Sequence, residues 1–63
     1  MPGLSDRDYA DILIALDNLY DEYKAQVVYF AREREDGLVD YWANKAKHIA
    51  QLREKVEKAR LAQ

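Results

Sequence analysis

Carboxylates gather at two places along the chain, and a single histidine follows them. The carboxylates are Asp17, Asp21 and Glu22 in the first group and Glu33, Glu35, Asp36 and Asp40 in the second. Helical carboxylates can hold a pair of metal ions inside a bundle, usually with Glu-x-x-His motifs. Here the residue three positions before His48 is Lys45, and neither carboxylate group falls on the apolar repeat described below. We therefore expect a solvated acidic surface, a histidine that is exposed or flanks the core, no metal site and no cofactor.

The residue types that nucleophilic catalysis requires are almost absent. The 63 residues include no cysteine and no threonine, and the only serine, Ser5, is better placed as a helix cap. The two glycines, Gly3 and Gly37, lie 34 positions apart, so the chain has no glycine-rich loop for a phosphate group. We therefore expect a protein without enzymatic activity.

Basic residues gather in the last third of the chain and suggest one binding function. They are Lys45, Lys47, Arg53, Lys55, Lys58 and Arg60. Together with tyrosines, they could hold a nucleotide or the phosphate backbone of RNA. The isoelectric point of about 5.2 is far below that of a usual nucleic-acid binder, so this function is the alternative and not the main prediction.

Aromatic residues are frequent for so short a chain. They make up 11% of it, with five tyrosines, one phenylalanine and one tryptophan. Tyrosine and tryptophan are enriched at the energetically dominant positions of protein interfaces. The interaction surface that we predict consists of Ile14, Val28, Tyr29, Tyr41 and Trp42.

The first element that must position these side chains is a helix from about residue 6 to 36. Ser5 can accept a hydrogen bond from the backbone of Asp8, whose side chain can bond back, and this is the pattern of a helix N-cap. Apolar or aromatic residues then recur at intervals of four and three, as in a coiled coil or helical bundle. The repeat consists of Tyr9, Leu13, Leu16, Tyr20, Tyr23, Val27, Phe30 and Arg34, and all but the last of these are apolar or aromatic.

A second helix is expected from about residue 39 to 61, after a turn at Gly37. Glycine just beyond a periodic run is the most common helix terminator, because it adopts left-handed backbone angles without strain. Asp40 could cap the second helix. The same spacing continues through Leu38, Trp42, Lys45, Ile49, Leu52, Val56, Ala59 and Gln63, with Val39 and Ala46 beside it.

The charge distribution favours folding one helix back on the other. Residues 1–40 contain ten acidic and four basic residues, whereas residues 41–63 contain two acidic and six basic residues. A reversal at Gly37 places residue i near residue 74 − i, so the acidic start of the first helix meets the basic end of the second. The same register places Trp42 near Phe30.

Two alternatives stay open at the level of sequence. One uninterrupted helix could pass through Gly37 at a cost of about 1 kcal/mol, and two such rods would pair as a domain-swapped version of the hairpin. Alternatively, residues 26–30 are β-prone and Asp36-Gly37 is a hairpin dipeptide, which would give an α-β-β-α order.

The predicted fold is all-α: residues 1–63 form a single domain, an antiparallel helical hairpin of two long helices that assembles as a helical bundle. Burial of apolar surface in a chain of this size contributes about 95 kcal/mol, and ordering the chain costs about the same. With no disulfide available, association with another chain is the remaining stabiliser. We therefore expect a homodimer that forms a four-helix bundle.

The function that we predict is that of a small non-enzymatic protein-interaction module, acting through its aromatic surface as a regulator, inhibitor or assembly factor. Short chains without catalytic residues are common among phage and mobile-element accessory proteins. The expected partners are a second copy of the chain and a heterologous protein target. The N-terminus lacks the pattern of a signal peptide and no stretch is apolar enough to span a membrane, so we expect a cytoplasmic protein without a membrane partner.

Overall fold

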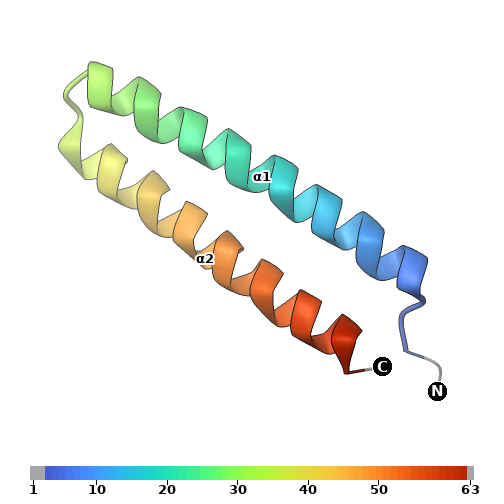
Figure 1. Ribbon diagram of the computed structural model, residues 1–63. Helices are drawn as coiled ribbons and strands as arrows, with labels where there is room; N and C mark the ends of the chain where they lie inside the picture. Colours follow the sequence, from blue (N-terminus) through green and yellow to red (C-terminus); the bar gives the residue numbers. More distant parts are fainter. Residues whose placement is uncertain (1–2, 63) are drawn as a thin grey trace.

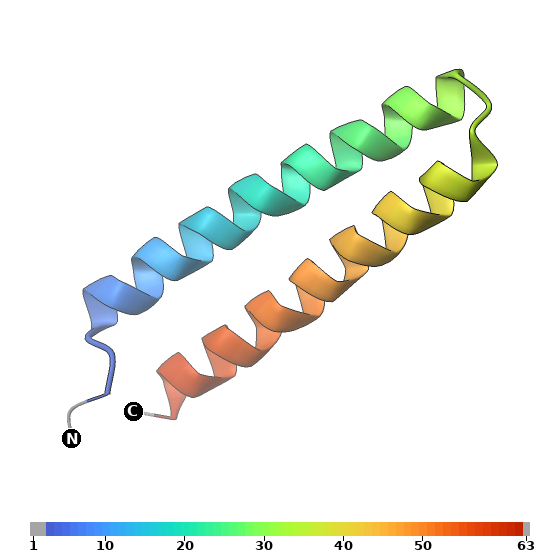
Figure 2. The same ribbon diagram turned by 180° about the vertical axis from the view of Figure 1, so that it is seen from behind.

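Two long antiparallel helices make up the computed structural model, which describes residues 3–62. α1 spans Asp6–Arg32 and α2 spans Asp36–Leu61. In Figure 1 the short link lies at one end of the hairpin, while the start of α1 and the end of α2 lie at the other, and Figure 2 shows this from behind. The predicted all-α helical hairpin is confirmed. Within residues 3–62 there is no strand and the chain reverses between the helices, so the α-β-β-α order and the continuous rod are both wrong.

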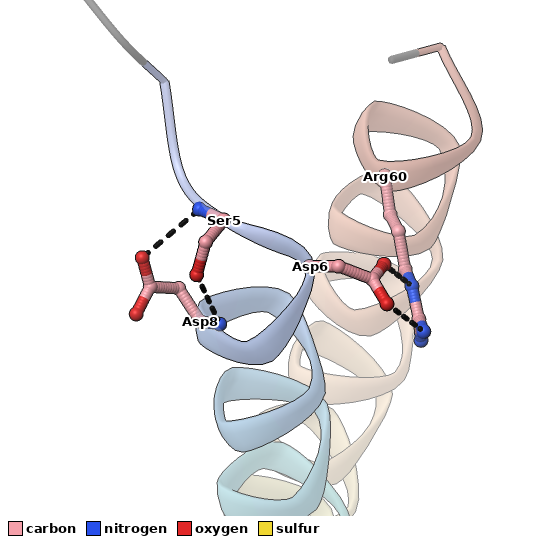
Figure 3. A network of polar contacts seen from close by, with 4 residues as sticks. All are labelled: Ser5, Asp6, Asp8 and Arg60. Atoms are coloured by element: carbon pink, nitrogen blue, oxygen red, sulfur yellow. Dashed lines mark hydrogen bonds and ion pairs between the residues drawn. The ribbon is translucent and has the colours of Figure 1, made fainter.

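α1 begins where the sequence predicts. Ser5 is the N-cap, and its hydroxyl accepts a hydrogen bond from the Asp8 amide at 3.1 Å. The Ser5 amide donates in return to the Asp8 carboxylate at 3.0 Å (Figure 3). This reciprocal pair satisfies amides that the start of a helix would otherwise leave without partners. The carboxylates of Asp6 and Asp8 also lie where the helix dipole favours negative charge.

α1 ends at Arg32, four residues before its predicted end, and backbone hydrogen bonds around Arg34 terminate it. The Arg34 amide donates to the Ala31 carbonyl at 3.2 Å, and the amide of Glu35 donates to the Phe30 carbonyl at 3.0 Å. These two bonds form a Schellman motif, which closes a helix when the residue after the C-cap adopts left-handed backbone angles. That residue is Arg34, whose φ is 58°.

Gly37 is therefore not the helix terminator, and the turn does not lie at residue 37. Within the described residues no glycine has a positive φ, and Gly37 is the second residue of α2. The N-cap of α2 is Glu35, which makes no side-chain cap hydrogen bond, while the predicted cap Asp40 lies inside the helix. The prediction fails because left-handed angles cost a residue other than glycine only about 1–2 kcal/mol, which contacts elsewhere in the hairpin can offset.

The substitution Arg34→Gly is expected to stabilise the hairpin by about 1 kcal/mol, because glycine adopts the conformation found at position 34 without strain. Urea unfolding followed by circular dichroism measures the change. Arg32→Gly is the matched control: Arg32 is still helical, so glycine there should destabilise by up to about 1 kcal/mol. Effects of the same sign at both positions would contradict the turn at residues 33–35.

The substitution Gly37→Ala is expected to stabilise as well, by up to about 1 kcal/mol, because alanine is the better helix former. An added Cβ at Gly37 meets no atom within 4 Å, so no clash opposes the gain. A glycine terminator at this position would give the opposite sign, since alanine resists a positive φ. The same unfolding measurement applies, and a loss of stability would argue for a turn at residue 37 after all.

The packed face of α1 follows the predicted repeat. Tyr9, Leu13 and Leu16 are buried, and the later members as far as Phe30 are half-buried. The last member of the repeat, Arg34, is exposed in the turn. The most buried residues of α1 therefore lie in its first half, away from the turn.

The packed face of α2 is rotated relative to the prediction. Its less exposed residues include Val39, Trp42, Ala46, Ile49, Arg53, Val56 and Arg60. The predicted core members Leu38, Leu52 and Ala59 are exposed, and Gln63 lies outside the described residues. Ala46 is only 2% exposed. Because α1 carries tyrosines along its packed face, a small residue opposite them suits close packing better than a leucine does.

The two helices are also shifted along each other by about one heptad relative to the prediction. The ring centroids of Trp42 and Tyr23 are 5.3 Å apart, whereas the prediction placed Trp42 near Phe30. Contacts across the hairpin join residues whose numbers sum to between 65 and 70, not to 74. The reason is the earlier turn, because a reversal near Arg34 moves every cross-hairpin partner toward the start of α1.

Candidate functional site

Ion pairs join the acidic start of α1 to the basic end of α2, as the charge distribution predicts. The Arg60 guanidinium donates two hydrogen bonds to the Asp6 carboxylate, at 2.8 and 3.2 Å (Figure 3). The Arg53 guanidinium lies between the carboxylates of Asp17, at 2.6 Å, and Glu57, at 2.7 Å. Exposed pairs of this kind add little to stability, but they favour the antiparallel arrangement over others.

These hydrogen bonds raise the pKa of both arginines above the ordinary value. The main cause is the bond to Asp17 for Arg53 and the bond to Asp6 for Arg60. Since the pKa is higher in the folded chain, the stabilising contribution of each arginine is fully present below the ordinary arginine pKa and is lost only as the pH rises above it. The arginine side of these pairs is therefore insensitive to pH around neutrality.

The six basic residues predicted as the alternative phosphate site are not gathered into one site. Three of them, Arg53, Lys58 and Arg60, form ion pairs with acidic residues of the same chain. A fourth, Lys45, lies over aromatic rings, and the remaining two lysines are exposed on α2. The structure thus provides no concentrated patch of free positive charge on the described part of α2.

The Lys45 ammonium lies over three aromatic rings that both helices contribute. Its Nζ is 4.9 Å from the ring centroid of Tyr23, 5.0 Å from that of Trp42 and 5.3 Å from that of Tyr41. The rings also pack on one another, and Trp42 meets Tyr41 edge to face with centroids 5.2 Å apart. Because the face of each ring attracts a cation, this arrangement orders the lysine and holds the aromatic cluster in a fixed shape.

A groove of about 370 Å³ opens beside this cluster, between α1 and α2. It is lined by Tyr23, Tyr41, Asn44, Lys45, His48 and Ile49. A second hollow, near the turn, is lined by Tyr29, Phe30, Glu33, Glu35 and Leu38. The walls of the first groove are mostly apolar, whereas two glutamates make the second hollow more polar, so only the first groove suits an apolar side chain of another molecule.

The two hollows belong to one exposed surface, which we call the aromatic face. On α2, residues 38, 41, 45, 48 and 52 follow one another at intervals of three and four, so they form one stripe along the helix. The hollow that Tyr29 shares with Leu38 joins α1 to this stripe. The aromatic face thus consists of Tyr29, Leu38, Tyr41, Lys45, His48 and Leu52.

The structure brings only part of the predicted interaction surface together. Tyr29 and Tyr41 belong to the aromatic face, and Trp42 supports it as a half-buried residue packed against the Tyr41 ring. Ile14 and Val28 are 60% and 50% exposed, but an acidic residue lies midway between them on the same stripe of α1. These two residues therefore form no continuous apolar surface.

Sequence reasoning missed Leu38 and Leu52 as surface residues because it assigned both to the core. A second repeat with the same spacing runs through Val39, Ala46 and Arg53, and it leaves both leucines outside. The alanine at position 46 is the signal that could have identified this repeat, since small residues occur where helices approach closely, and the structure buries it.

The described residues offer little else that bears on function. Residues 3–62 contain no group of three or more His, Cys, Asp or Glu side chains that could hold a metal ion, and His48 is exposed. In the same part of the chain, neither helix combines the length and the apolar character needed to cross a membrane. No family model, curated protein or solved structure matches the chain. The aromatic face is therefore the feature from which a function can be inferred.

Proposed function

We propose that the protein is a small non-enzymatic interaction module that binds another protein chain through its aromatic face. The observation that carries this proposal is the exposure of large apolar side chains on one surface. The two tyrosines and two leucines of the face are each between 37% and 55% exposed. Covering such side chains contributes about 25 cal/mol per Å² of apolar area removed from water. Large apolar side chains that gather exposed on one side of a small protein are typical of a docking site.

The aromatic face is also ordered before any partner binds. Helices carry all six of its residues, and the rings of Tyr23 and Trp42 pack beside it. Lys45 is held over three rings and is half-buried, so its charge is already partly shielded from water. Tyrosine has few rotatable bonds, so fixing it at an interface costs little entropy. These properties favour binding energy concentrated at the aromatic residues.

A module of this kind acts by occupying a surface of its target, as a regulator, an inhibitor or an assembly factor. A partner helix laid along the stripe of α2 would meet side chains at intervals of three and four, which is the pattern of helix packing. The four-helix bundle predicted from the sequence is one assembly that covers the face in this way.

Nucleotide or RNA binding, the alternative prediction, has less support than protein docking. The ion pairs of Arg53, Lys58 and Arg60 already neutralise half of the proposed phosphate-binding residues. Phosphate contacts would make affinity fall steeply with salt concentration, whereas apolar docking would not. Binding of a labelled single-stranded RNA at low and high salt separates the two functions.

A photo-crosslinking amino acid at position 41 tests the proposal in the cells that make the protein. We expect adducts from position 41 and far fewer from the same amino acid at position 28, which is equally exposed but lies off the aromatic face. The mass of each adduct identifies the trapped chain. Equal yields at the two positions, or no adduct from position 41, would contradict the proposal.

A further inference from the structure

We infer that the aromatic face is covered by a second copy of this chain, so that two hairpins pack side by side as a four-helix bundle. The inference rests on the proposed function and names its partner. In the pair, α1 of each copy lies against α2 of the other, and a two-fold axis runs along the bundle.

One hairpin exposes more area than a compact chain of its mass, and the excess has the size that such a pairing removes. The hairpin exposes 5009 Å², whereas a compact monomer of 7.4 kDa exposes about 4,200 Å². The excess of roughly 800 Å² equals the area that each partner contributes to a standard protein interface. A second hairpin of the same size, lying along one long side of the first, is therefore large enough to cover this excess area.

The shape of the hairpin indicates a partner of the same length lying alongside. Its radius of gyration is 14.6 Å, against about 10.6 Å for a compact domain of 63 residues and about 13.8 Å for one twice as long. Its extents are 48 × 16 × 14 Å, so it is long enough for a larger domain but too thin. A second hairpin alongside thickens the cross-section, whereas end-to-end contact would only lengthen the molecule.

The core of a single hairpin is small for its length. Its buried apolar residues are Tyr9, Leu13, Leu16, Ala46 and Ile49. Within residues 3–62 no large side chain is fully covered. A single core in a chain of this size rarely supplies more than about 3–5 kcal/mol of stability. A second hairpin over the aromatic face would extend this core toward the turn, where α1 is only half-buried.

The charges of the chain suit a second copy. α1 belongs to the acidic part of the sequence and most of α2 to the basic part, so α1 against α2 of the other copy repeats the attraction found within the hairpin. Lys45 forms no ion pair within residues 3–62. Glu22 and Trp42 line the same hollow, and the cross-hairpin register places Glu22 at the level of Lys45. Glu22 of the second copy is therefore placed to meet the Lys45 ammonium.

Sedimentation equilibrium of the full chain between about 1 and 300 μM tests the pairing. We expect the mass to rise from 7.4 kDa toward twice that value. Tyr41→Asp combined with Leu52→Asp puts two carboxylates on the aromatic face and should raise the dissociation constant at least about 100-fold. Ile14→Asp combined with Val28→Asp is the matched control, which changes exposed residues off the face and should pair normally.

Three outcomes of this experiment overturn the inference. They are a mass of 7.4 kDa at every concentration, a mass above two copies, and equal loss of pairing in both double variants. If the face variant does not fold, thiol protection tests the pairing in its place.

Protection of a single introduced thiol shows which surface the pairing covers. It changes only one exposed side chain at a time, so the hairpin should stay folded. The chain has no cysteine, so Tyr41→Cys and Val28→Cys each introduce a unique thiol. Between about 1 and 300 μM, the thiol at position 41 should become at least about fivefold slower to react with a maleimide, and the thiol at position 28 should not change. Unchanged reactivity at position 41 overturns the inference.

The pairing and the proposed function fail in different ways. A chain that stays monomeric but forms adducts with another protein from position 41 would overturn the pairing and leave the interaction module intact. A chain that forms no adduct from position 41 would overturn both the pairing and the proposed function.

Discussion

Replacing Leu13 with alanine is expected to lower the free energy of unfolding by about 2–5 kcal/mol. Leu13 is 7% exposed on the face of α1 that packs against α2, so truncation removes buried methyl groups and leaves a cavity between two rigid helices. Since a chain of this size has only about 3–5 kcal/mol of stability from one core, the variant should be largely unfolded near 37 °C. Urea unfolding monitored by circular dichroism at a fixed protein concentration measures the effect.

The neighbouring residue provides the matched control. Ile14 is 60% exposed, and Ile14→Ala should change the free energy of unfolding by no more than about 0.5 kcal/mol. The two substitutions remove side chains of similar size from adjacent positions of one helix, so they differ mainly in burial. Equal losses for both variants would show that α1 presents a different face to α2.

Raising the protein concentration from about 1 to about 100 μM is expected to increase the unfolding midpoint by about 5–10 °C. The physical reason is mass action, since only folded hairpins pair and a hundredfold increase in concentration favours the pair by about 2.7 kcal/mol. Thermal unfolding followed by circular dichroism at the two concentrations measures the shift.

The variant Tyr41→Asp with Leu52→Asp serves as the control for this measurement. Its unfolding midpoint should be lower than that of the unmodified chain and should not depend on concentration, because the aromatic face no longer pairs. An unmodified chain whose midpoint stays constant between the two concentrations, with a mass of 7.4 kDa in solution, would rule out stabilisation by association.

The start and the packed face of α1 were predictable because both depend on short stretches of sequence. The Ser5 and Asp8 cap is a local interaction across three residues, and it is present as expected. The repeat from Tyr9 to Phe30 is apolar or aromatic at every position, and Ile12 and Leu19 only widen the face that it buries. The end of α1 was less predictable, because the αL residue is Arg34 and not a glycine.

The packed face of α2 was not predictable in the same way, because two repeats of identical spacing run along this helix. One repeat includes Leu38 and Leu52 and has the greater hydrophobicity, whereas the other includes Ala46 and Arg53 and is the one that packs against α1. Hydrophobicity alone favours the first. The second is selected by contacts with α1, namely the space left beside its tyrosines and the carboxylate of Asp17 that meets Arg53.

Local interactions and sums of charge along the chain were therefore sufficient to predict two helices, the start of the first, its packed face and the antiparallel order. The position of the turn, the register of the helices and the composition of the aromatic face depend on how the helices pack. The physical reason is that a shift of one heptad, or a small rotation of α2, keeps the same apolar spacing of three and four residues. The sequence pattern alone therefore does not distinguish these arrangements. The turn at Arg34 and the close packing at Ala46 remove this ambiguity, and they leave Leu38 and Leu52 exposed beside Tyr41.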